Sequence, residues 1–171
     1  MLPDDDALWD IFERGHQLLS AAGYRQYETS AYAKPGYQCR HNLNYWRFGD
    51  YLGIGCGAHG KLTFSDGRIL RTAKTKHPRG FMQGKYMDKQ HEVTTADRPF
   101  EFFMNRFRLL EAAPRADFAN YTGLDESVIR PQLDEALEKG YLEETAEYWQ
   151  ITEKGKLFLN SLLELFLVDD E

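Results

Sequence analysis

The feature that most constrains the fold of this chain is a change in charge and residue pattern near residues 95–99. Residues 1–96 hold 13 Lys and Arg against 10 Asp and Glu, a balance of +3, whereas residues 97–171 hold 8 against 17, a balance of −9. Domain boundaries commonly coincide with such changes. We therefore predict two units, residues 1–96 and residues 97–171.

The composition restricts the class of protein. A chain of 171 residues with 14% aromatic residues can bury a core, and it has no run of about 18 apolar residues to cross a membrane. The acidic start MLPDDDALWD lacks the basic and then apolar pattern of a secretory signal. Cys39 and Cys56 form no C-x-x-C pair, which fits a reducing compartment and argues against a metal site made from thiols. We expect a soluble cytoplasmic protein.

The first unit predicts a mixed α/β or α+β fold. Residues 3–23 have helical apolar spacing, and residues 24–33 alternate like a strand. A helix followed by a strand is the repeating element of a parallel sheet or (β/α) barrel. Residues 34–50 then read as a loop at the end of that strand, residues 51–60 as another strand, and Asp66-Gly67 as a hairpin turn. No period is visible in residues 73–96.

The second unit predicts helices with a small hairpin. Residues 98–110 place five apolar side chains on one helical face: Phe100, Phe103, Met104, Phe107 and Leu110. A short helix, a turn at residues 122–123, a helix ending at Gly140, a hairpin in residues 142–152 and a final helix in residues 153–167 follow. This order is typical of a winged helix. Pro131 should either kink its helix or mark the true start of that helix.

The charge of the second unit argues against nucleic-acid binding. Its second helix carries mostly acidic side chains, with Asp125, Glu126, Asp134, Glu135 and Glu138 against Arg130 and Lys139. Binding to DNA needs Lys and Arg along the docking face. We expect no nucleic-acid partner.

Three features are candidates for chemistry, and each has a structural alternative. His41 lies beside Asn42, Tyr45 and Trp46 and could be a haem ligand, although a structural histidine is the commoner case. Gly53, Gly55, Gly57 and Gly60 allow close approach of either a ligand or a neighbouring strand. A basic run could be a solvated face or could bind carboxylates such as porphyrin propionates; it comprises Lys61, Arg68, Arg71, Lys74, Lys76, Arg79, Lys85 and Lys89. No motif for hydrolysis or phosphoryl transfer is evident, so we assign no catalytic residue.

Four ordered motifs carry a resemblance to a known family. YETSAYAKPGYQCRHNLNYW, YLGIGCGAHG, RTAKTKHPRGFMQG and RPFEFFMNRFRLL together resemble the HemW-type radical SAM haem chaperones, a family similar to the oxygen-independent coproporphyrinogen III oxidases. The resemblance runs nearly end to end. It implies the late strands and helix of a partial (β/α) radical SAM barrel over residues 1–96, followed by a small winged-helix-like domain over residues 97–171.

The resemblance also implies cofactors and site residues. The family holds a [4Fe–4S] cluster on a C-x-x-x-C-x-x-C loop and uses S-adenosylmethionine, but this chain has no such loop. We therefore expect the C-terminal portion of a longer protein, which by itself binds no cluster and performs no radical chemistry. The H-N-x-x-Y-W motif falls on His41, Asn42, Tyr45 and Trp46, which implies haem contact with His41 as the iron ligand.

Two further sets complete the residues that the resemblance implies. The glycine-rich segment resembles a strand at the S-adenosylmethionine pocket, through Gly53, Gly55, Gly57 and His59. From the basic run, the residues expected to anchor propionates are Arg71, Lys74, Lys76 and Arg79.

The resulting hypothesis is a haem chaperone that binds haem and passes it to an acceptor haem protein. An alternative is the oxidase, which converts coproporphyrinogen III by radical decarboxylation, and an alternative of another class is a winged-helix regulator. Removal of early barrel strands should leave an unpaired edge near residues 27–33, which favours a dimer. A peripheral membrane contact of the longer protein is a further expected interaction.

Overall fold

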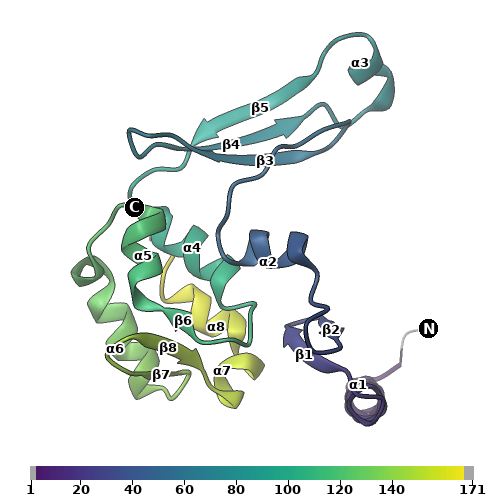
Figure 1. Ribbon diagram of the computed structural model, residues 1–171, viewed down its shortest axis with the longest axis vertical. Helices are drawn as coiled ribbons and strands as arrows, with labels where there is room; N and C mark the ends of the chain where they lie inside the picture. The colour runs from purple at the N-terminus through teal and green to yellow at the C-terminus, as the bar shows by residue number, and fades with distance from the viewer. Residues whose placement is uncertain (1–2, 168–171) are drawn as a thin grey trace.

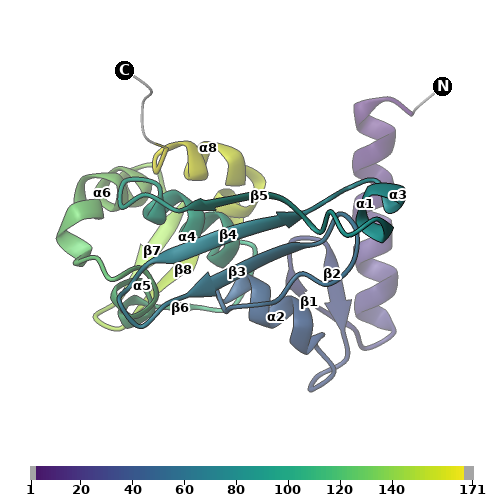
Figure 2. The ribbon, with the colours of Figure 1, turned by 90° about the horizontal axis from the view of Figure 1, so that it is seen from above.

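The computed structural model describes residues 3–167, so the outermost ends of the two predicted units, residues 1–2 and 168–171, lie outside the described residues. Within that range the strands form three small antiparallel sheets (Figures 1 and 2). They are β1 (Arg25–Glu28) with β2 (Ala31–Ala33); β3 (His59–Thr63), β4 (Ile69–Lys74) and β5 (Met87–Glu92) in that order; and β6 (Ala113–Pro114), β8 (Tyr148–Ile151) and β7 (Leu142–Glu144) in that order. The helices are α1 (Asp5–Ala21), α2 (Arg40–Trp46), α3 (Pro78–Met82), α4 (Arg98–Arg106), α5 (Arg115–Thr122), the 3₁₀ helix η1 (Glu126–Ile129), α6 (Arg130–Glu138), α7 (Glu153–Leu157) and α8 (Leu159–Glu164).

Helix α1 confirms the first predicted helix. The carboxylate of Asp4 accepts a hydrogen bond from the backbone N–H of Ala7 at 2.9 Å and caps the first turn. Gly23 ends the helix with a φ of 83°. No residue of α1 is buried, so its apolar stripe packs only lightly on the rest of the described chain, and Figure 2 shows α1 running along one end of the molecule.

The strand predicted for residues 24–33 is instead a hairpin. β1 pairs antiparallel with β2, with Arg25 opposite Ala33, and no parallel pair occurs in residues 3–167. The turn forms because the buried carboxylate of Glu28 accepts hydrogen bonds from the N–H and hydroxyl of Ser30. The predicted open edge is also partly covered, because backbone bonds join β1 and its turn to residues 108 and 110.

Two other local predictions are wrong. Residues 40–46, predicted as loop, form helix α2, in which Leu43 and the aromatic side chains turn toward β1 and the sheet β3–β5. Residues 51–60, predicted as a strand, are mostly irregular: Tyr51 makes one bridge to Lys61, and the regular strand begins only at His59. Gly55 and Gly57 have φ values of 96° and 71°, which an extended strand cannot contain.

The sheet β3–β5 and helix α3 form an arm that extends over the rest of the chain (Figure 1). The Asp66-Gly67 turn joins β3 to β4 as predicted, and Gly67 has a φ of 85°. β4 then pairs with β5, a strand that the sequence pattern did not predict. β5 is one of the two edge strands of this sheet, and its charged residues discourage pairing with another chain.

The C-terminal elements occur in the predicted order. Helix α5 ends at Gly123 with a φ of 71°, Pro131 lies at the start of α6 rather than inside it, and β7 and β8 form the expected hairpin. Two details differ. The last helix is divided at Phe158 into α7 and α8. On α4 the buried apolar residues are Phe102 and Phe103, beside buried Asn105 and Arg106, while Met104 remains 37% exposed, because α4 packs on two sides rather than one.

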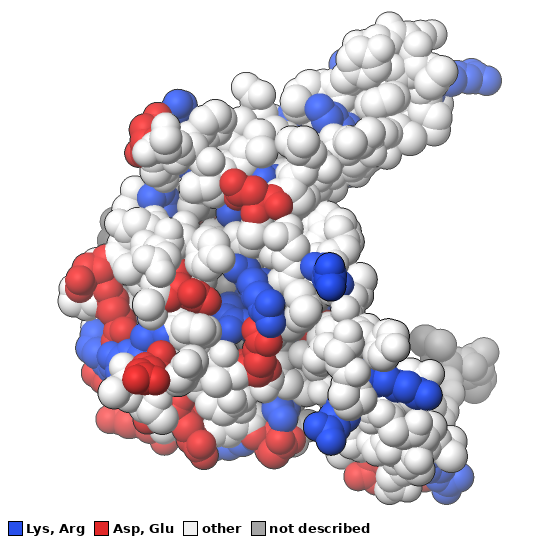
Figure 3. All heavy atoms as spheres, in the orientation of Figure 1, with Lys and Arg blue, Asp and Glu red and all other residues white. Residues whose placement is uncertain are grey.

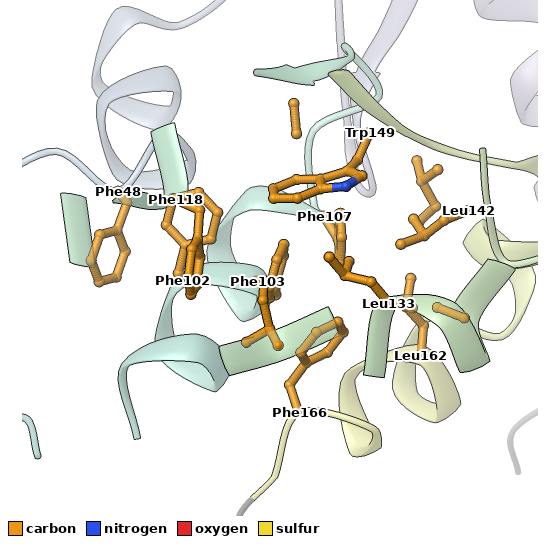
Figure 4. Close-up of a cluster of buried hydrophobic side chains, with 14 of the residues drawn as sticks. Phe48, Phe102, Phe103, Phe107, Phe118, Leu133, Leu142, Trp149, Leu162 and Phe166 are labelled. Atoms are coloured by element: carbon orange, nitrogen blue, oxygen red, sulfur yellow. The ribbon is translucent and has the colours of Figure 1, made fainter. Parts of the chain in front are cut away.

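The core surrounds α4 (Figure 4). Phe103 stacks on Phe107 at 4.6 Å and on Phe118 at 5.8 Å between ring centroids, and its edge meets Trp149. Phe48 from the first unit meets Phe102 edge-on at 5.6 Å. The buried cluster therefore includes side chains from both predicted units, residues 1–96 and residues 97–171.

An ion pair joins α2 to the segment after α4. Arg47 donates two hydrogen bonds of 2.8 Å to the carboxylate of Glu111, and Arg106 donates a third of 2.9 Å. Hydrogen bonds from Arg47, and secondarily from Arg106, hold the pKa of Glu111 below its ordinary value of 4.5. A carboxyl group with a lowered folded-state pKa stabilises the fold above its unfolded-state pKa, and this stabilisation is lost as pH falls through the lowered pKa.

We therefore expect Glu111→Gln to lower the free energy of unfolding at pH 7 and to make that free energy depend less on pH between 5 and 3. Urea denaturation at a series of pH values measures both effects. An unchanged pH dependence in Glu111→Gln would show that other carboxyl groups dominate acid unfolding.

Candidate functional site

The largest assembly of predicted site residues surrounds a cavity of about 470 Å³ between the sheet β3–β5 and helices α2 and α4, which we call the sheet pocket. Its aromatic wall consists of Tyr45, Trp46 and Tyr51. The sheet contributes His59, Arg71, Ala73, Lys89 and His91, and α4 contributes Glu101, Met104 and Asn105. Most of the lining is apolar, which suits a flat aromatic ligand with a few polar groups at its edge.

Helix α2 presents the aromatic wall. His41 and Tyr45 are one helical turn apart, and their rings meet edge-on at 4.5 Å between centroids. The ring of Tyr45 also contacts the ring of Tyr51, with 4.0 Å between the two centroids. His41 is exposed and does not itself line the sheet pocket, so it stands beside the pocket, against the ring of Tyr45.

Asn42 and Trp46 lie in different surroundings. The side-chain amide of Asn42 donates to the hydroxyl of Tyr27 at 3.3 Å and so ties α2 to β1. The guanidinium of Arg108 lies over the Trp46 ring at 4.4 Å. The indole nitrogen of Trp46 is buried without a hydrogen-bond partner among the described residues. Of the H-N-x-x-Y-W residues, only Tyr45 and Trp46 therefore line the sheet pocket.

Arg71 reaches the sheet pocket, but its guanidinium already has partners. It donates to the hydroxyl of Tyr51 at 2.9 Å and forms an ion pair with Glu101. Burial raises the pKa of Tyr51 even though Arg71 acts in the opposite direction. This triad therefore fixes the wall of the pocket between the sheet and α4.

The other three predicted anchors lie away from the pocket. Lys74 ends β4, where its backbone N–H bonds to Ala58 at 2.8 Å, and Lys76 and Arg79 are exposed around α3 toward the far end of the arm. None of the three lines the sheet pocket. Two residues of β5 do so instead, namely Lys89 and His91. Lys89 and His91 are two positions apart, so their side chains share one face of β5. The sequence pattern did not reveal β5, and so it could not identify them.

The glycines favour the structural alternative at two positions. A Cβ atom on Gly53 would collide with the carbonyl group of His59, and one on Gly60 would lie 2.7 Å from the Thr72 hydroxyl oxygen. Gly53 and Gly60 therefore allow neighbouring backbone and strand segments to approach one another. Gly55 and Gly57 serve left-handed turns. His59 is the one member of the predicted cofactor set that lines the sheet pocket.

Lys61 belongs to the predicted basic run, yet it is buried, with 1% of its surface exposed. Its ammonium group donates to the carbonyl of Phe48 at 3.0 Å and to the Asp50 carboxylate at 2.9 Å. Burial lowers the pKa of Lys61 although Asp50 favours its charged form. For Asp50, burial acts to raise the pKa, but hydrogen bonds from Lys61 and Thr63 outweigh burial and lower it. Lys61 thus links the arm to the segment after α2.

A second cavity of about 430 Å³ lies between α1 and the C-terminal elements. Trp9 and Phe12 of α1 face Phe107 and Leu157 across it. None of the predicted site residues lines this cavity, which is the competing location for an apolar ligand.

Metal and membrane signals are absent from the described part of the chain. In residues 3–167 no three His, Cys, Asp or Glu side chains are grouped so that they could hold a metal ion, and Cys39 and Cys56 are exposed and unpaired. None of the helices in that range combines the length and the apolar character that a membrane crossing requires.

Comparison with known proteins agrees with the motifs. The family model of the HemN C-terminal domain matches residues 93–158. The chain is 79% identical over 169 residues to the heme chaperone HemW of Escherichia coli (strain K12), which is 99% of this chain and 45% of that protein. It is 67% identical over 169 residues to the heme chaperone HemW of Haemophilus influenzae, which is 99% of this chain and 44% of that protein.

A solved structure shares the fold. Coproporphyrinogen III oxidase (HemN) from Escherichia coli, described as a radical SAM enzyme, superposes with a TM-score of 0.69 over 96% of this chain and 42% of that one, at 16% sequence identity. The chain spans less than half the length of the curated relatives that it matches. At 79% identity over 99% of its length, the chain is similar to just under half of the heme chaperone HemW of Escherichia coli.

Proposed function

We propose that this chain binds haem in the sheet pocket and, within a HemW-type haem chaperone, takes part in passing that haem to an acceptor protein. The relatives that carry the name heme chaperone support this function. The observation that carries the location is that Tyr45 and Trp46 of the H-N-x-x-Y-W motif line the same cavity as His59 and Lys89 of the sheet. Aromatic walls, imidazoles and a cation together fit a flat iron porphyrin with carboxylates at its edge.

Each residue of the motif has a proposed role. Tyr45 and Trp46 form the aromatic wall, Asn42 fixes α2 on β1, and His41 supplies the iron ligand from its position beside Tyr45. The exposed imidazole of His41 suits a cargo that must leave again, because a solvent-accessible ligand can be exchanged for one from the acceptor.

The longer protein would add further chemistry. We infer that a [4Fe–4S] cluster and S-adenosylmethionine belong to segments outside this chain, because the chain lacks the C-x-x-x-C-x-x-C loop. We retain as proposals the late radical SAM barrel in residues 1–96 and the winged-helix-like domain in residues 97–171. The match of the HemN C-terminal domain, which begins at residue 93, supports a division near that point.

The C-terminal domain is the proposed docking surface for the acceptor. Figure 3 shows acidic side chains gathered on the visible face where α6 and β7 lie. The basic side chains there are engaged: Arg115 pairs with Glu126, and Arg130 pairs with Asp134 and Glu144. Such a surface repels nucleic acid, so we propose a protein partner rather than the function of a winged-helix regulator. The oxidase has no specific support, because the likeness to HemN is one of fold.

Replacement of His41 tests the proposed iron ligand. We expect His41→Ala to weaken ferric haem binding about tenfold or more and to change the position of the Soret band, because an iron–nitrogen bond is lost; a tenfold change corresponds to about 1.4 kcal/mol. His77→Ala, at an exposed histidine beside α3, is the matched control and should bind as the wild type does. An unaltered Soret band and affinity in His41→Ala would exclude His41 as the ligand.

A further inference from the structure

The face of the arm that lines the sheet pocket has a regular arrangement. Across the three strands, Ala73 of β4 is paired with His59 of β3 on one side and with Lys89 of β5 on the other. Because side chains two positions apart share a face, Arg71 and His91 of the next row point the same way. His59, Arg71, Ala73, Lys89 and His91 all line the sheet pocket, together with Gly60 and Thr72 from the intervening positions.

Ala73 makes the centre of this face shallow. Its methyl group is the smallest side chain of the row, and the longer side chains of His59 and Lys89 stand on either side of it. The aromatic residues of α2 and Met104 of α4 line the pocket with them. A ligand edge that lay over Ala73 would therefore have a nitrogen-bearing side chain on either side of it.

The basic side chains near this face differ in whether they already form an ion pair within the protein. Arg71 is held by Glu101 and Tyr51, and Lys61 is buried against Asp50. Within residues 3–167, Lys89 forms no ion pair, and it is exposed. Lys74, Lys76 and Arg79, which the sequence suggested as anchors, do not line the pocket. Lys89 is therefore the pocket cation that can form an ion pair with a ligand without first losing one.

We infer that Lys89 of β5, with His59 across Ala73, binds a carboxylate of the ligand of the sheet pocket, and that the bases at the far end of the arm do not. This inference rests on the proposed function, since it takes the ligand to be a porphyrin with propionate groups. The ammonium group of Lys89 forms a charge-assisted hydrogen bond to one carboxylate, and the imidazole of His59 donates to the same edge.

A pair of ligands isolates this contact. Ferric haem and its dimethyl ester share the porphyrin ring and the iron, but the ester carries no carboxylate. Both ligands are titrated into the full chain, in the same dilute detergent, and binding is followed through the Soret band. We expect Lys89→Ala to bind haem about fivefold more weakly than the wild type does and to bind the dimethyl ester with unchanged affinity, as a partly exposed ion pair of about 1 kcal/mol implies.

Three variants complete the design. Lys89→Arg should retain haem affinity, His59→Ala should weaken the binding of haem more than that of the ester, and Lys85→Ala, at an exposed lysine away from the pocket, should behave as the wild type. Equal affinities of the wild type and Lys89→Ala for haem, or equal losses for haem and ester, would overturn the inference. A wild-type chain that saturated with neither ligand would instead overturn the proposed function, and the inference with it.

Discussion

Replacing Phe103 with alanine is expected to lower the free energy of unfolding by about 3–5 kcal/mol, the usual loss when a buried phenylalanine is truncated. Phe103 is fully buried, and its ring contacts Phe107, Phe118, Trp149 and Phe166. These rings come from the end of α4, from α5, from β8 and from the segment after α8. The cavity that Phe103→Ala creates would therefore lie where the C-terminal elements meet. Urea denaturation followed by tryptophan fluorescence measures the loss.

The adjacent residue provides the control. Met104 is on the same helix but 37% exposed, so Met104→Ala should change the free energy of unfolding by much less than Phe103→Ala does. The sequence pattern placed Phe103 and Met104 on one buried face, which would make the two losses similar. In the structure α4 packs on two sides, which makes the loss for Phe103→Ala much the larger. A loss below about 1 kcal/mol for Phe103→Ala would contradict the described core.

Replacing Tyr45 with alanine is expected to weaken haem binding about 10-fold to 100-fold. Tyr45 lines the sheet pocket and supports the rings of His41 and Tyr51. Burial of an aromatic side chain against a ligand contributes about 1.5–3 kcal/mol, which corresponds to that range of affinity. Titration of each variant with ferric haem, followed through the Soret band, measures the change.

Two variants define what Tyr45 contributes. Tyr45→Phe keeps the ring and should retain most of the affinity, because the ring rather than the hydroxyl forms the proposed contact. Tyr37→Ala removes an exposed ring in the loop before α2 and should leave haem binding unchanged. Wild-type affinity in Tyr45→Ala would place the haem elsewhere on the molecule.

Local sequence signals predicted the elements that short-range chemistry determines. Asp4 and Gly23 delimit α1, Gly67 turns the β3–β4 hairpin, and Pro131 starts α6. Asp4 acts through its side-chain carboxylate, and the two glycines and the proline act through their backbone conformation, so each decides the local structure whatever surrounds it. Of the motif H-N-x-x-Y-W, Tyr45 and Trp46 line the sheet pocket, and His41 and Asn42 do not.

Long-range contacts account for what the sequence pattern missed. Nothing local distinguishes Lys61, which is buried, from Lys76, which is exposed; the difference comes from the Phe48 carbonyl and the Asp50 carboxylate, more than ten positions away. Lys76 does not line the sheet pocket whereas Lys89 does, and the sequence pattern gave no reason to prefer Lys89 because β5 was not visible in it. β5 has no buried residue and hence no alternation of apolar side chains, and its pairing with β4 is what brings Lys89 into the pocket.

Binding of a porphyrin in the sheet pocket is tested most directly by nuclear magnetic resonance of the ¹⁵N-labelled chain titrated with diamagnetic zinc protoporphyrin. We expect saturable changes in chemical shift at Tyr45, His59, Lys89 and Met104, which line that cavity. Changes gathered instead around Trp9 and Phe12 in the cavity beside α1, or the lack of any saturable change, would contradict binding in the sheet pocket.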